Sequence, residues 1–135
     1  MSYSIETIEG IGPAMAKKLS AAGIKTTAGL LKECASAKGR KATAETTGVS
    51  EKVLLKLANM ADLMRIKGVG EEYSELLEAA GVDTVKELRN RNAENLTAKM
   101  SEVNADKKLV RQTPSGSMVE KWVAEAKTLD PTITH

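Results

Sequence analysis

A short glycine pattern that occurs twice constrains the fold of this chain more than any other feature of its sequence. Ile8–Gly12, which reads IEGIG, recurs 58 residues later as Ile66–Gly70, which reads IKGVG. The same offset carries the stretch 22–24 onto 80–82 without a gap. The matching residues are Gly10, Gly12, Leu19, Ala22, Gly23, Thr26 and Leu30, and in the second copy Gly68, Gly70, Leu77, Ala80, Gly81, Thr84 and Leu88. Such a repeat indicates one supersecondary unit that is used twice.

Each copy predicts a tight turn between two helices. Paired glycines let the backbone turn without a Cβ in the way, and the apolar residue between them can pack into the helix pair. The following helix begins with unpaired N–H groups and the positive end of its dipole, which attract phosphate oxygens. The pattern resembles the helix-hairpin-helix motif of proteins that hold DNA or RNA by its backbone. The residues assigned to the hairpin structure are Ile11, Gly23, Gly68, Val69, Gly70 and Gly81.

The composition favours a helical core. Hydrophobic residues make up 41% of the 135 residues, but there is no Phe, one Trp and two Tyr. Sheets draw on aromatic and β-branched residues, whereas the abundant Ala, Leu, Glu and Lys favour helices. We therefore predict an all-α fold in which two related helix-hairpin-helix units pack as one compact domain. The first unit is expected over residues 1–64, the second over 65–129, and a frayed tail over 130–135.

Capping residues predict where the helices begin and end. Pro13 suits the first position of a helix, and Gly23 and Gly81 suit the left-handed position that follows one. Thr84 and Glu87 have the spacing of a capping box. Further N-caps are expected at Ser50, at Asn92, and at either Ser115 or Ser117. Lys38–Lys41 reads as a basic turn, and Asn104–Arg111 as a short separate helix.

Other resemblances support this helical reading. Ala79–Leu88 resembles a stretch of the C-terminal domain of the RNA polymerase alpha subunit, and Gly48–Lys56 resembles the end of the N-terminal domain of archaeal recombinases. Over residues 5–129 the chain resembles a small bacterial family, domain of unknown function 4332, with the same hairpin phrases, the Lys38–Lys41 turn and a final helix that bears Trp122. This resemblance implies an all-helical double hairpin and supplies no established function.

The net charge of +2 is unevenly distributed, which places the candidate phosphate contacts in the first half. Residues 1–62 contain nine Lys or Arg and six Asp or Glu, whereas residues 63–135 contain eleven and twelve. In the second copy Glu71 and Glu72 occupy the place of a phosphate, so that hairpin is expected to be structural. A solvated helix face or a solubilising loop is the alternative reading of the lysines. The candidate nucleic-acid-binding residues are Gly10, Gly12, Ala14, Lys17, Lys18, Lys38, Arg40 and Lys41.

Catalytic chemistry has little support in this sequence. The only histidine is His135, and Cys34 lies on an apolar stripe with Leu30 and Leu31, which suits a buried, inert thiol. Trp122, at helical spacing with other apolar residues, is expected in the core rather than on a stacking surface. We expect a non-enzyme with no cofactor, metal or small-molecule substrate.

The expected location and function follow from these patterns. There is no apolar run of membrane-spanning length, no signal-peptide pattern at the start and only one Cys, so we expect a cytoplasmic protein. The predicted function is non-catalytic, sequence-independent binding of the nucleic-acid (DNA) backbone. The alternative is an adaptor that binds another protein with the same helical scaffold.

Overall fold

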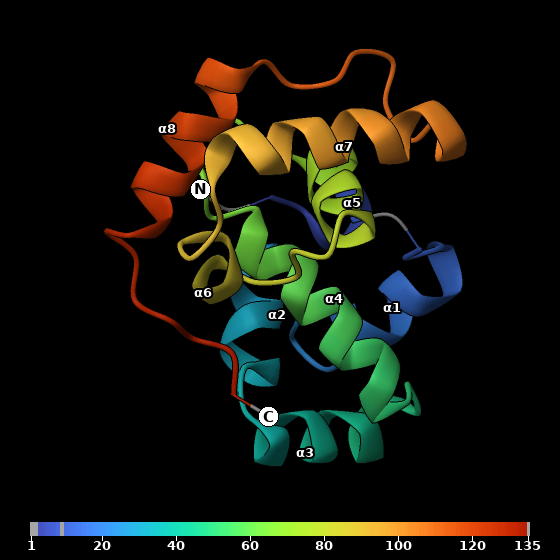
Figure 1. Ribbon diagram of the computed structural model, residues 1–135. Coiled ribbons are helices and arrows are strands. Elements are labelled where there is room, and N and C mark those ends of the chain that lie inside the picture. The colour runs from blue at the N-terminus through green and yellow to red at the C-terminus, as the bar shows by residue number, and fades with distance from the viewer. Residues whose placement is uncertain (1–2, 9, 135) are drawn as a thin grey trace.

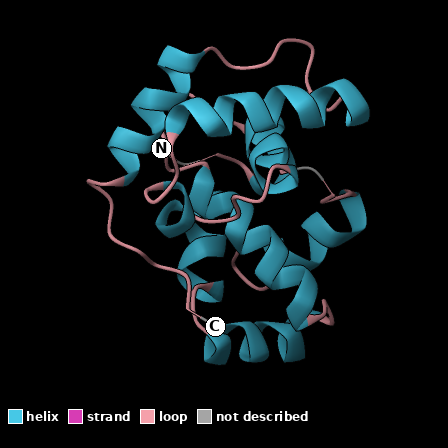
Figure 2. Ribbon diagram, viewed as in Figure 1, coloured by secondary structure: helices cyan, strands magenta, loops and turns pink. Residues whose placement is uncertain are grey.

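A computed structural model describes residues 3–8 and 10–134 of the chain, and the described part is all-helical, as predicted (Figure 2). A single antiparallel bridge joins Ser4 to Thr26. None of the helices in these two ranges has the length and apolarity needed to cross a membrane. The elements are the 3₁₀ turn η1 (Ile5–Thr7), α1 (Pro13–Ala21), α2 (Thr27–Cys34), α3 (Ala37–Thr47), α4 (Glu51–Leu63), α5 (Glu71–Ala79), α6 (Val85–Leu88), α7 (Ala93–Lys107) and α8 (Gly116–Ala126).

The two glycine turns have the same local structure. Gly10 and Gly68 have φ of 94° and 89°, a left-handed conformation that favours glycine. The amides of Ile11 and Val69 each donate to the carbonyl three residues earlier at 3.1 Å. Both side chains are buried, with 9% and 0% exposure, as predicted. The repeated phrase therefore builds the same turn twice.

The helices that follow the turns also end alike. Gly23 and Gly81 have φ of 86° and 96°, as predicted for left-handed residues after a helix. Each glycine amide donates to the carbonyl three residues back at 3.0 Å. The next amide donates to Leu19 O at 2.9 Å in the first copy and to Leu77 O at 2.8 Å in the second. This pair of bonds defines a Schellman motif, and Ile24 and Val82, which complete it, are buried.

The predicted caps at Ser50, Asn92 and Ser115 are confirmed, since each side chain accepts a bond from the first turn of its helix. Thr84 Oγ1 accepts from Glu87 N at 3.2 Å, which is one half of the expected capping box. Glu87 Oε1 accepts instead from Arg91 Nη1 at 3.3 Å, one turn further along the chain.

Two segment predictions were wrong. Lys38–Lys41 is part of α3 rather than a turn, because Ser36 Oγ accepts from Gly39 N at 3.0 Å and starts the helix there. Asn104 does not start a separate helix, because α7 continues to Lys107 and ends at Lys108, which has a φ of 52°. Asn104 then makes two bonds to the backbone of Val110, at 2.9 and 3.0 Å, and holds the loop that leads to α8.

Two hydrophobic clusters form the interior. The first gathers residues from η1 and α1–α4, and the second gathers residues from α5–α8 and the segments between them. The end of α4 connects them, because Met64 belongs to the first cluster and Leu63 to the second. Trp122 is buried in the second cluster, as predicted, with its ring centroid 5.2 Å from that of Tyr73.

The tail was expected to be frayed, but its described residues, 130–134, pack against the first half of the chain. We call this segment the C-terminal strap. It runs down from α8 to the region of α3 in Figure 1. Ile133 is buried in the first cluster, and Thr134 N donates to Ala35 O at 2.8 Å. Arg65 Nη1 donates to Asp130 O at 3.0 Å. Burial of an apolar side chain and pairing of backbone groups together offset the entropy of ordering the segment.

Candidate nucleic-acid interface

The N-terminal end of α1 presents open backbone donors. Gly12 is the N-cap, with extended backbone and no side-chain cap, and Pro13 is the first helical residue. The amides of Ala14 and Met15 have no hydrogen-bond partner within residues 3–8 and 10–134. Gly10, Gly12 and Ala14 are exposed, and a Cβ built on either glycine would have no neighbouring atom within 4 Å. An anion can therefore approach this helix end closely.

The equivalent end of α5 is covered in part, although its N-cap, Gly70, has no atom within 4 Å of its Cβ position. A Cβ added to Gly68 would lie 3.4 Å from Trp122 Nε1 of α8. Lys67 N, in the same turn, donates to Glu125 Oε1 of α8 at 3.1 Å. The first turn of α5 carries Glu71 and Glu72, whose charges suit the helix dipole. Both observations agree with the expectation that the second hairpin is structural.

The candidate lysines lie on two different helices. Lys17 and Lys18 are exposed on α1, and Lys38 and Lys41 are exposed on α3. None of the four takes part in an ion pair within the described ranges. The C-terminal end of α1 meets α3, where Ala22 and Ile24 help to line a small cavity of about 130 Å³ with α3 residues. Helix α1 is about 14 Å long, so Gly12 and the α3 lysines lie at opposite ends of α1.

Arg40 does not belong to the exposed cluster. Its side chain is buried, with 4% exposure, and donates to three backbone carbonyls. Arg40 Nη1 donates to Cys34 O at 3.0 Å and to Ala35 O at 2.9 Å, and Nη2 donates to Thr134 O at 2.7 Å. Burial and these bonds exclude a phosphate contact, so we remove Arg40 from the candidate site. The sequence could not predict that Arg40 is buried, because one of the carbonyls that it binds, Thr134 O, lies far away in the chain.

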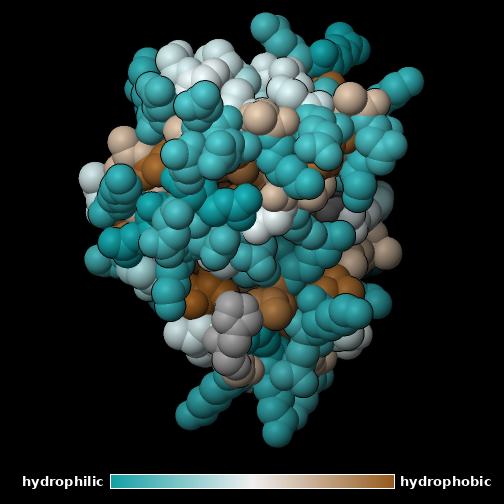
Figure 3. Space-filling view, viewed as in Figure 1, coloured by the Kyte–Doolittle hydropathy of each residue, from teal (hydrophilic) through white to brown (hydrophobic). Residues whose placement is uncertain are grey.

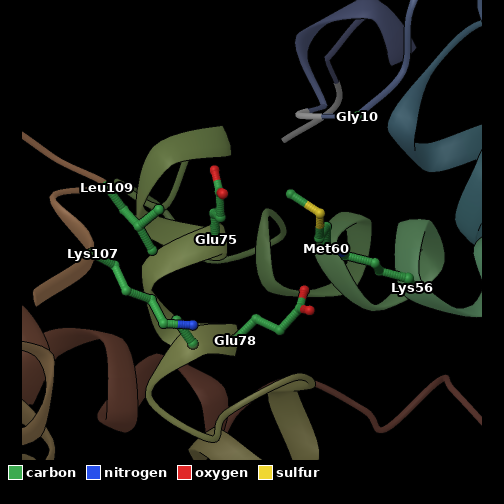
Figure 4. A pocket seen from close by; sticks show the side chains of 8 residues that line it. Gly10, Lys56, Met60, Glu75, Glu78, Lys107 and Leu109 are labelled. Carbon is green, nitrogen blue, oxygen red and sulfur yellow. The ribbon is translucent and has the colours of Figure 1, made fainter. Parts of the chain in front are cut away.

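A cleft that contains both acidic and basic side chains borders the first glycine turn. It has a volume of about 280 Å³, and its lining includes Gly10, Glu75 and Glu78 of α5, Lys56 of α4 and Lys107 of α7. Figure 4 shows both carboxylates directed into the cleft, with Gly10 at its upper edge. Glu78 Oε2 is buried without a hydrogen-bond partner among the described residues. The sequence did not suggest this neighbour.

The surface offers few apolar side chains. The face drawn in Figure 3 is mostly hydrophilic, with smaller apolar patches between polar side chains. Val53, with 36% exposure, is the one large hydrophobic side chain classed as exposed in the described ranges. Cys34 is fully buried, as predicted, and desolvation raises the pKa of its thiol above the ordinary value of 9.0 despite the hydrogen bond with Thr43. In the described part of the chain no group of His, Cys, Asp and Glu residues is arranged to hold a metal ion.

Comparison with known proteins defines the class of this chain. Residues 9–129 match a family described as a domain of unknown function. The match covers most of the chain, which therefore belongs to this family, DUF4332. No solved structure matches.

Proposed function

We propose that this protein holds nucleic acid by its sugar–phosphate backbone, without sequence preference, through the N-terminal end of α1. We interpret each glycine turn, with the helices on either side, as a helix-hairpin-helix unit. The observation that carries the proposal is the difference in cover between the two turns. Gly10 and Gly12 have open space around them, whereas Gly68 lies against Trp122. A phosphate group needs a close approach to backbone N–H groups. Gly70, the α5 counterpart of Gly12, also has no atom within 4 Å of its Cβ position, but it is half-buried and leads into Glu71 and Glu72, whose charges repel a phosphate.

The side chains support the same surface. The amides of Gly12 and Ala14 would hold one phosphate, and Lys17 and Lys18 lie one turn further along the exposed face of α1. Lys38 and Lys41 on α3 would contact the strand at a second point. Contacts of this kind position a protein on nucleic acid but do not read bases, and the largest ring, Trp122, is buried rather than available for stacking.

We also propose that the protein is not an enzyme. Its one thiol, Cys34, is buried and has a raised pKa, so it stays protonated and out of reach of a substrate at neutral pH. The open surface at α1 presents amides and lysines, which suit anion binding rather than proton transfer at neutral pH.

A salt titration with duplex and single-stranded DNA tests the proposal. With about 2 to 4 phosphates in contact, log K should fall with log salt at a slope of roughly −2 to −4. The affinity should be in the non-specific range, with Kd of about 10⁻⁴ to 10⁻⁶ M. The double variant Lys17→Glu/Lys18→Glu should abolish binding and leave the unfolding midpoint unchanged, because both side chains are exposed and make no ion pair with a described residue.

A matched control separates this surface from net charge. Lys121→Glu/Lys127→Glu makes the same change of charge at exposed positions in and after α8, and it should retain most of the affinity. Charge reversal by Glu71→Lys/Glu72→Lys should not weaken binding either. The proposal fails if the wild-type protein binds neither form of DNA at low salt, where backbone attraction is strongest, or if the two lysine pairs contribute equally.

A further inference from the structure

A second concave surface lies away from the first hairpin. This groove has a volume of about 490 Å³ and is lined by Ala28, Leu31 and Lys32 of α2, by Ala61 of α4, by Arg65 just after α4, and by Thr132 of the C-terminal strap. In Figure 1 the strap and α1 lie on opposite sides of α2 and α4. The volume is within the range of about 300 to 1,000 Å³ that is typical of binding sites. We call this surface the strap groove.

The charges of the strap groove have one sign. Its floor is apolar, with Leu31 at 8% and Ala61 at 3% exposure, and its lining contains Lys32 and Arg65 but no carboxylate. Lys32 is exposed and has no ion pair within the described ranges. An apolar floor with a cationic rim is complementary to a ligand that combines an apolar group with a carboxylate.

Hydrogen bonds to one nitrogen of its guanidinium hold the Arg65 side chain in place. Its Nη1 donates to Asp62 Oδ1 at 2.8 Å, to Asp130 O at 3.0 Å and to Thr132 Oγ1 at 3.1 Å. The Nε and Nη2 donors have no partner among the described residues. These two donors form one planar edge of the guanidinium, which matches a carboxylate bidentately. The Arg65 side chain is therefore fixed through Nη1, and its Nε and Nη2 donors remain available to bind a carboxylate.

An extended peptide already lies along this side of the molecule. The C-terminal strap is held by its backbone, since Arg65 and Arg40 bind the carbonyls of Asp130 and Thr134 and the amide of Thr134 binds Ala35 O. Its one buried apolar side chain, Ile133, fills an adjoining part of the first cluster. The strap thus shows how backbone pairing and one apolar anchor fasten a peptide here.

We propose that the strap groove binds an acidic peptide segment of a partner protein, with an apolar side chain on the floor and a carboxylate on Arg65 and Lys32. A sugar–phosphate backbone could use the cations but would leave the apolar floor uncovered, so a peptide fits the groove better. This interaction is separate from the proposed nucleic-acid surface and does not depend on it. A chain with both surfaces would link a protein to nucleic acid.

Selection from a displayed library of random peptides on the full chain tests the proposal. Two variants block the groove at exposed positions, Lys32→Glu by reversing a charge and Ala28→Glu by adding a carboxylate at its edge. Lys52→Glu, exposed at the opposite end of α4 from Arg65, is the matched control. The enriched peptides should carry Asp or Glu close to a large apolar residue. Synthetic copies should bind wild type and Lys52→Glu equally.

Each groove variant should weaken binding of these peptides at least about tenfold, which corresponds to about 1.4 kcal/mol, with unchanged unfolding midpoints. The proposal is overturned if no peptide is enriched, if the enriched peptides lack acidic residues, or if they bind the groove variants as tightly as wild type. It is also overturned if Lys17→Glu/Lys18→Glu abolishes peptide binding, because the peptides would then occupy the α1 surface.

Discussion

The turn before α1 and the turn before α5 have the same backbone and different surroundings. Both contain a left-handed glycine followed by a buried apolar residue, and both lead into a helix that ends in a Schellman motif. Trp122 and Glu125 of α8 lie against the second turn at Gly68 and Lys67, whereas a Cβ built at Gly10 or Gly12 would have no atom within 4 Å. The comparison teaches that a repeated unit can serve packing in one copy while its other copy remains available for binding.

The side chains of α1 and α5 also differ in a way that favours anion binding at α1. At the 58-residue offset, Lys17 on α1 corresponds to Glu75 on α5, and Lys18 corresponds to Leu76. Both lysines are exposed, but Leu76 is fully buried, because α5 packs against α4 and α7 and exposes little of its surface. The charge difference adds to the difference in cover and makes α1 the copy that is suited to an anion.

The largest expected effect comes from removing the cover over the second turn. Trp122→Ala should cost about 3 to 5 kcal/mol of unfolding free energy, because a buried aromatic side chain leaves a cavity. Urea denaturation measures the loss, and amide hydrogen exchange should show it first in α5 and α8. Val53→Ala, at a 36% exposed position, should cost far less. Equal losses for the two variants would contradict the assignment of α8 as a cover.

The next effect concerns the first cluster, which a residue from the far end of the chain completes. Ile133→Ala should destabilise the protein by about 2 kcal/mol, at the low end for a buried Ile, and should speed amide exchange in α2 and α3 rather than in α7 and α8. Pro131→Ala, at an exposed strap position, should change the unfolding midpoint little. Unchanged exchange in α2 and α3 would show that the strap does not support this cluster.

Two glycine substitutions test the equivalence of the repeats. Gly23→Ala and Gly81→Ala should each cost about 1 kcal/mol, because a left-handed backbone is unfavourable for a residue with a Cβ. Gly116→Ala, at the start of α8 with nothing near its Cβ position, should be neutral or slightly stabilising. Denaturant midpoints decide the matter. A large difference between the two repeat variants would break the proposed equivalence.

The smallest effect tests the two carboxylates, Glu75 and Glu78, in the cleft beside Gly10. At a distance of about 10 Å in water, each carboxylate repels a phosphate by about 0.4 kcal/mol. Glu75→Gln/Glu78→Gln should therefore tighten DNA binding by roughly threefold to fourfold at low salt, with the gain lost at high salt. Glu94→Gln/Glu102→Gln on the exposed side of α7 is the control. An equal gain for both pairs would mean that only net charge matters.

Much of the local structure could be predicted from residues close together in sequence. The turns at Gly10 and Gly68, the helix ends at Gly23 and Gly81 and the cap at Ser50 depend on steric and hydrogen-bonding preferences of a few neighbouring residues. The candidate site was predicted less completely. Gly10, Gly12, Ala14 and the four lysines are exposed where α1 and α3 present them, but Arg40 is buried because carbonyls of α2 and of the strap meet its guanidinium.

The sequence by itself determined that this protein is helical and that one glycine turn and one helix end are used twice, because φ preferences and helix periodicity act over short stretches of chain. Only the tertiary structure decided which copy stays open. That outcome depends on where α8 and the strap pack against the rest of the protein. Both segments lie more than 40 residues along the chain from the turns that they cover or support. Packing over such separations depends on the combined shape of all the helices, which no local pattern encodes.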